Sequence, residues 1–260
     1  MLQPRILAIL NILGLVLVLV LNSMANALPI NGFNTGQVSA FYPNLFVPAG
    51  FTFSIWSLIY LMMIGFVAVS VKWIWHAPDM PTGKLAQAVS PLFLLTCLVN
   101  AGWILAWHYL MTGLSVFIML VFLSLLILIY LKMQPFRESL SGFRKFFLYS
   151  FFIVYLGWIS VATIANITAL LVKMKWTGLG LEPAYWSLTM MAVAILLGLL
   201  FIVKKRDHAF AWVIAWALFG IHGAQSERTP AIGQLALAGI ALLLAYSALN
   251  LYMDRRRRMA

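Results

Sequence analysis

Long apolar runs are the feature that most constrains this chain. There are eight of them, each close to the 17–25 residues that a helix needs to cross a bilayer. Their approximate limits are 6–25, 50–75, 90–110, 113–133, 146–172, 184–203, 208–224 and 231–252. Inside lipid, only helices and closed barrels satisfy every backbone hydrogen bond, and these runs have helical length. The sequence therefore predicts an all-α, polytopic membrane helix bundle with eight spans.

The overall composition supports a membrane protein. Hydrophobic residues make up 64% of the chain and charged residues only 9%, whereas soluble domains carry about a quarter charged residues. The formal net charge of +11 suggests nucleic acid at first, but the basic residues flank apolar runs. We therefore expect the lipid bilayer as a partner and no nucleic acid. Cys97 is the only cysteine, which excludes an intrachain disulfide.

Lys and Arg are unevenly divided between the two ends of the spans. On one side lie 14 of the 17, namely Arg5, Lys72, Lys84, Lys132, Arg137, Arg144, Lys145, Lys204, Lys205, Arg206 and Arg255 to Arg258. Cytoplasmic loops carry such an excess. With an even number of spans, the prediction is a multi-pass protein of the cell inner (cytoplasmic) membrane, with both termini cytoplasmic. The first run also resembles a cleavable secretory signal, which would leave the remaining topology unchanged.

The positions of charged residues also limit the chemistry. Every acidic and basic residue falls at a span end or in a loop, whereas ion-coupled transporters usually keep a charge in mid-membrane. The sequence lacks H-E-x-x-H, G-x-S-x-G and P-loop patterns. We therefore predict no catalytic residues, no metal site and no enzymatic activity.

Several spans carry polar and aromatic residues on one helical face. In YLGWISVATIAN, residues 155–166, a helical period places Tyr155, Trp158, Ala162 and Asn166 within an arc about 80° wide. Two other spans show comparable sets: Thr96, Asn100, Trp103 and Trp107 on one, and Phe53, Trp56 and Tyr60 on the other. An unpaired amide in hydrocarbon costs several kcal/mol, so these faces should point away from lipid.

Two interpretations of these faces remain open on spacing alone. They can be helix–helix contacts, in which Asn and Thr bond across an interface and tryptophans fill volume. They can equally line a pocket whose few polar groups orient a flat apolar ligand.

Three motifs resemble the TspO/MBR family of tryptophan-rich sensory proteins, also called translocator proteins. The stretch 155–166 fills every position of that family's fifth-helix signature, Y-L-x-W-x-x-x-A-T-x-x-N. Ile55-Trp56 followed by Tyr60 resembles the second-helix entry, and Leu98-x-Asn100-x-x-Trp103 resembles the third-helix motif. The resemblance covers about residues 1–175.

The resemblance implies a five-helix TspO-like bundle at 1–175, with a ligand pocket beneath the 23–49 loop. Family members bind porphyrins, haem-like tetrapyrroles and sterols. The predicted ligand-binding residues are Trp56, Tyr60, Asn100, Trp103, Trp107, Tyr155, Trp158, Ala162 and Asn166. No cofactor is required, and a tetrapyrrole (porphyrin or haem) is the expected ligand. His108 and His222 are the histidines that could ligate haem iron within the bundle, although lone histidines at helix ends are more often interfacial.

The chain also departs from the family. Typical members stop after five helices, whereas residues 176–260 add three further spans and a basic tail, predicted as a second domain. The expected function is binding of a flat hydrophobic ligand, for sensing or handling. The alternatives are a membrane transporter of a small lipophilic compound and a porphyrin-modifying enzyme. A homodimer is a further option.

Overall fold

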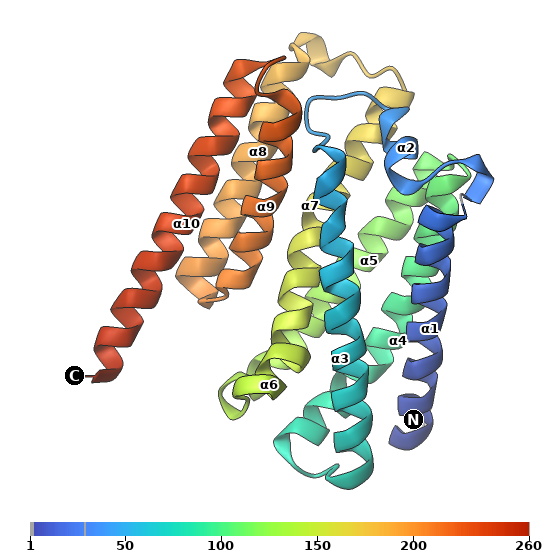
Figure 1. Cartoon of the computed structure of the whole chain (residues 1–260), viewed down its shortest axis with the longest axis vertical. Coiled ribbons are helices and arrows are strands. Elements are labelled where there is room, and N and C mark those ends of the chain that lie inside the picture. Colours follow the sequence, from blue (N-terminus) through green and yellow to red (C-terminus); the bar gives the residue numbers. More distant parts are fainter. Residues whose placement is uncertain (1–2, 29, 260) are drawn as a thin grey trace. The chain divides into compact units, whose positions relative to one another are not determined.

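The computed structural model describes residues 3–28 and 30–259, and every regular element within them is helical (Figure 1). The long helices are α1 Pro4–Ala27, α3 Ile55–His76, α4 Pro81–His108, α5 Thr112–Met133, α7 Phe151–Lys173, α8 Pro183–Leu200, α9 His208–Gln225 and α10 Pro230–Met259. The short ones are α2 Thr35–Ala40 and α6 Gly142–Lys145. Single π-type turns, Phe146–Ser150 and Phe201–Lys205, precede α7 and follow α8. The predicted all-α membrane bundle is confirmed.

The chain forms two compact units. The first comprises Met1–Phe41 and Ser54–Ile159, and the second comprises Tyr42–Phe53 and Ser160–Ala260. The division falls inside α7, so this helix contributes to both units. The boundaries of these units, at residues 41, 53 and 159, differ from the boundary at residue 175 between the predicted domains 1–175 and 176–260.

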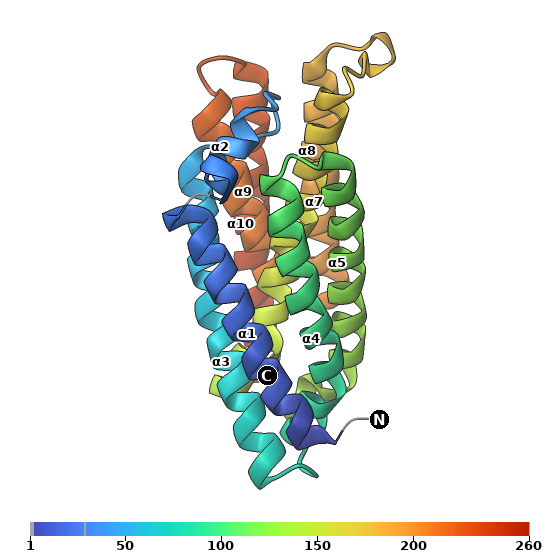
Figure 2. The ribbon, with the colours of Figure 1, turned by 90° about the vertical axis from the view of Figure 1, so that its right-hand side faces the viewer.

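The first unit is built on α1, α3 and α4. These helices pack against one another, and α5 lies beside α4 (Figure 2). Phenylalanine rings fill the core, with the Phe66 centroid 4.7 Å from that of Phe93 and 4.9 Å from that of Phe152. Such ring pairs contribute beyond the apolar area that they bury.

Helix α4 begins earlier than the sequence predicts. We predicted a span over 90–110, whose second residue is Pro91. In the structure the helix begins at Pro81, and Pro91 lies inside it. An internal proline removes one backbone hydrogen bond, a loss that membrane helices tolerate where their neighbours cover the freed group.

The second unit contains the helices α8, α9 and α10, which pack against one another and are joined by short turns (Figure 1). The segment 42–53 lies against α9. The Ala49 backbone N–H donates to the Gly220 carbonyl at 2.9 Å, and Trp216 Nε1 donates to the Thr52 carbonyl at 2.9 Å. Glycine is required at 220, because a Cβ there would collide with Thr52 Oγ1.

Seven helical segments in the described part of the chain are long and apolar enough to cross a membrane. The predicted span 208–224 is present as α9 but is not among the seven. Polar residues at its ends, His208, His222 and Gln225, lower its hydropathy. More than half of its residues are buried, so this helix is surrounded largely by protein.

Candidate functional site

Trp56 on α3 lies at the centre of an aromatic cluster in the first unit. Its ring centroid is 5.6 Å from Tyr60, 6.2 Å from Trp103, 6.1 Å from Tyr155 and 6.2 Å from Trp158. The rings come from α3, α4 and α7, the three helices that carry the sequence motifs. Side chains more than 100 positions apart in the sequence therefore meet, as the motifs predict.

Four rings of the cluster form a row with nearly parallel planes. The interplanar angles are 20° between Tyr60 and Trp56, 28° between Trp56 and Trp103, and 18° between Trp103 and Trp107. Trp103 and Trp107 are each only 5% exposed, whereas Trp56 and Tyr60 are half-buried. The row therefore has a closed end on α4 and a more open end on α3, where a further flat ring system could stack.

Asn100 holds helices together. Its Oδ1 accepts a hydrogen bond from Asn22 Nδ2 at 2.8 Å, and its Nδ2 donates to the Tyr155 hydroxyl at 3.3 Å. The side chain is fully buried, so these bonds satisfy groups that would otherwise be costly in the bundle. The helix-contact interpretation therefore explains Asn100, and a direct contact of its amide with a ligand stays a prediction.

Unlike the Asn100 amide, the Trp103 indole has no hydrogen-bond partner in the described structure. Its Nε1 is buried and has no hydrogen-bond acceptor among the described residues. An indole N–H only donates, and a buried donor without an acceptor costs about 1–3 kcal/mol. An oxygen atom brought by a ligand would satisfy it.

Ala162 and Asn166 lie one and two turns beyond Trp158 on α7, in the second unit. Ala162 is half-buried and Asn166 is buried. Their part in a ligand site stays a prediction.

The first part of the predicted 23–49 lid is fixed to the end of α4 by Thr35 of α2 and by Asn31 in the short turn Ile30–Gly32 before it. Trp107 Nε1 donates to the Thr35 carbonyl at 3.3 Å, and Asn31 Nδ2 donates to the His108 carbonyl at 3.0 Å. His108 is fully buried, with Nδ1 2.7 Å from the Ile104 carbonyl and Nε2 3.4 Å from Thr35 Oγ1. Both ring nitrogens are thus engaged within the protein, which makes His108 an anchor for the loop.

His222, the other histidine considered as a haem ligand, places Nδ1 3.0 Å from the Gly233 carbonyl. Within the described residues, no group of three or more His, Cys, Asp or Glu side chains lies close enough together to hold a metal ion.

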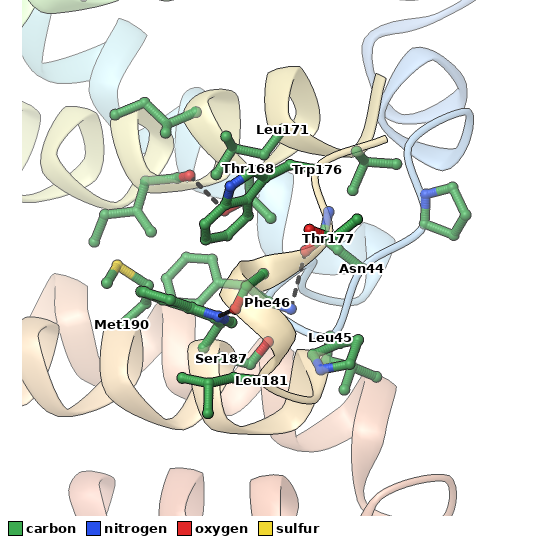
Figure 3. A pocket seen from close by; sticks show the side chains of 17 residues that line it. Asn44, Leu45, Phe46, Thr168, Leu171, Trp176, Thr177, Leu181, Ser187 and Met190 are labelled. Atoms are coloured by element: carbon green, nitrogen blue, oxygen red, sulfur yellow. Dashed lines mark hydrogen bonds between the residues drawn. The ribbon is translucent and has the colours of Figure 1, made fainter. Parts of the chain in front are cut away.

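The second unit contains a cavity of about 510 Å³ that the sequence did not predict (Figure 3). Four segments line it: residues 43–46, the α7 face from Ile164 to Val172, residues 176–181, and the first turns of α8 from Pro183 to Met190. Its volume is within the range of small-molecule sites. None of the predicted ligand-binding residues lines it.

Together, the helical fold and the buried aromatic cluster define an integral membrane protein with a candidate site for an apolar ligand. A family model described as TSPO-like protein matches residues 8–249. The chain belongs to this TSPO-like family. The match confirms the suspected TspO/MBR family. It continues beyond residue 175, and α8 and α9 lie within the matched range. No curated protein and no solved structure matches the chain.

Proposed function

We propose that this TSPO-like membrane protein binds a flat hydrophobic ligand, a tetrapyrrole or a sterol-like molecule, at the aromatic cluster around Trp56. The observation that supports this most strongly is the row of nearly parallel rings, whose Trp56 and Tyr60 end is only half-buried. A conjugated ligand would extend the row, and offset stacking of aromatic rings contributes about 0.5–1.5 kcal/mol per pair beyond burial.

The Trp103 N–H gives the site a polar contact. Because this buried donor has no acceptor within the described part of the protein, a ligand carbonyl or carboxylate oxygen beside it would gain a hydrogen bond. Pockets for apolar ligands typically combine such a single polar contact with aromatic walls.

The proposed role is sensing or handling of the ligand without chemical change, so the protein is neither an enzyme nor a transporter in this proposal. A porphyrin incubated with the protein should be recovered unmodified. A new product in the extract would favour the enzyme alternative. Homodimer formation stays a prediction.

The proposed location is the inner membrane with both termini cytoplasmic. Basic residues of the first unit lie against aromatic side chains near helix ends, with Arg5 5.5 Å from the Trp75 ring and Arg144 5.5 Å from the Trp73 ring. In the second unit, Arg206 pairs with Asp254 at 2.8 Å. Basic and aromatic residues together are typical of the cytoplasmic interface.

Titration with protoporphyrin tests the binding proposal. Protoporphyrin should quench the intrinsic fluorescence of the wild-type protein saturably. The Trp56→Ala variant should bind one to two decades more weakly, because it loses the ring on which the ligand stacks, and deletion of a central aromatic anchor costs about 2 kcal/mol or more.

The matched control is Trp75→Ala, which removes an indole that is 43% exposed and contacts Arg5 outside the cluster. It should leave the affinity unchanged. Equal affinities in wild type, Trp56→Ala and Trp75→Ala would refute the site.

A further inference from the structure

The cavity in the second unit is bounded by two helix faces that do not close on each other (Figure 3). On α7 the lining residues Ile164, Ile167, Thr168, Leu171 and Val172 follow the spacing of a single helical face. On α8 the lining positions 183, 186, 187 and 190 do the same. Faces of this kind normally pack against a neighbouring helix, but here they border a hollow of about 510 Å³.

The cavity is long and apolar. From Ile164 to Val172, the α7 wall extends about 12 Å along the helix axis, at 1.5 Å per residue. Most lining side chains are apolar, and Phe46, Trp176 and Trp186 contribute aromatic surface. None of the described residues that line it is charged. Burial also raises the pKa of the Tyr42 phenol in the adjoining segment, so this group stays neutral.

Most polar groups of the lining are already satisfied within the protein. Asn44 Nδ2 donates to the Tyr42 carbonyl at 2.8 Å, and Asn44 Oδ1 accepts from the Phe46 N–H at 3.0 Å. Trp186 Nε1 donates to the Gly178 carbonyl at 2.9 Å, and Thr168 Oγ1 donates to the Ile164 carbonyl at 2.8 Å. A charged occupant would lose its hydration without gaining an oppositely charged partner among the described lining residues, which is strongly unfavourable.

Other polar groups of the lining remain available to an occupant. In the described structure, the Ser187 hydroxyl and the Trp176 indole N–H make no hydrogen bond to other protein groups. Trp176 is 40% exposed, and its ring centroid is 5.0 Å from that of Trp186. Tryptophans concentrate at the membrane–water interface, where the polar end of a lipid-like molecule resides.

We infer that this cavity is a second ligand site, separate from the aromatic cluster, which takes a neutral single-chain amphiphile from the bilayer. The alkyl chain lies along the α7 wall, and one hydroxyl or carbonyl group meets Ser187 and Trp176. A dicarboxylate such as protoporphyrin does not fit this lining, because nothing in it neutralises a charge.

Photolabelling of the full-length protein in lipid nanodiscs tests the inference. The probe is a monoacylglycerol that carries a diazirine in its acyl chain. Peptide mapping should place the label on residues 164–172 and 183–190, and unlabelled monoacylglycerol should suppress it saturably. Label spread over lipid-facing residues without saturation would overturn the inference, and this outcome can be read from the wild-type protein alone.

Two substitutions form a matched pair. Thr168→Trp fills the cavity, whereas Thr189→Trp places the same residue at an exposed position of α8 outside it. Each threonine hydroxyl bonds to the carbonyl four residues earlier, so both variants lose the same kind of bond. Labelling should fall by about tenfold in Thr168→Trp and stay unchanged in Thr189→Trp. Equal labelling in the two variants would contradict the site.

The two sites can be told apart in the same experiment. Trp56→Ala should leave the labelling at 164–172 unchanged, and protoporphyrin should not compete with the probe. Competition by protoporphyrin would show that the cavity is not a separate site for a neutral amphiphile.

Discussion

Hydrogen-bond partners distinguish the polar side chains of the aromatic cluster from one another. Asn100 finds Asn22 and Tyr155 within the protein, whereas the Trp103 indole finds no acceptor in the described structure. Both side chains are buried on the same helix. A protein keeps an unsatisfied buried donor at a cost, and a bound ligand is one way to recover it.

Replacing Trp103 by Phe separates the effect of the unpaired N–H on stability from its effect on ligand binding. Trp103→Phe keeps an aromatic ring and removes the unpaired N–H, so thermal stability in detergent should hold or rise. Affinity for protoporphyrin should fall about fivefold, the worth of one hydrogen bond.

The matched control is Trp107→Phe, whose N–H donates to the Thr35 carbonyl. Losing that bond should lower the melting temperature. If Trp103→Phe instead loses as much stability as Trp107→Phe and binds normally, the indole N–H of Trp103 has no role in binding.

Among the helices, α1 shows how one element carries both satisfied and unsatisfied amides. Asn22 and Asn11 are both buried on it. Asn22 Nδ2 bonds to Asn100 Oδ1 at 2.8 Å and to the Val18 carbonyl at 2.9 Å. Both polar atoms of the Asn11 side chain lack a partner among the described residues. The same residue type thus has opposite energetic consequences about three turns apart on one helix.

Leucine substitutions at these two positions should change stability in opposite directions. Asn22→Leu leaves Asn100 Oδ1 buried without its donor and should destabilise the protein by about 1–3 kcal/mol. Asn11→Leu removes two unsatisfied groups and should be neutral or stabilising. Thermal unfolding in one detergent measures both. A loss of stability in Asn11→Leu equal to that in Asn22→Leu would mean that Asn11 has a partner that this structure does not contain.

Sequence periodicity predicts which residues share a helical face, and it succeeds for Trp56, Trp103 and Trp158. It does not identify the helix that meets the face, because a pairing such as Asn22 with Asn100 joins positions 78 apart in the sequence. The early start of α4 was missed because proline usually marks a helix boundary. The cavity was missed because it lies between one face of α7 and one face of α8 that do not pack against each other. Each face has an ordinary helical sequence pattern, which does not show whether a neighbouring helix covers it.

For the whole molecule, the uneven distribution of basic residues predicts topology. A reporter fused after Ala260 should read cytoplasmic, as should one placed within residues 135–145, and one near residue 178 should read external. The basis is that 14 of the 17 Lys and Arg residues fall on one predicted side. An external signal at the C-terminus would remove one crossing, and α9, which is not among the seven apolar segments, would be the helix that does not cross.

The most direct test of the central claim is to locate a bound porphyrin by crystallography. In crystals grown with zinc protoporphyrin, the anomalous signal of zinc marks the ligand without reliance on weak density. We expect a single strong peak beside the Trp56 ring, with the porphyrin plane stacked on the row formed by Tyr60, Trp56 and Trp103. A peak in the cavity lined by α7 and α8, or on the lipid-facing surface, would contradict this claim.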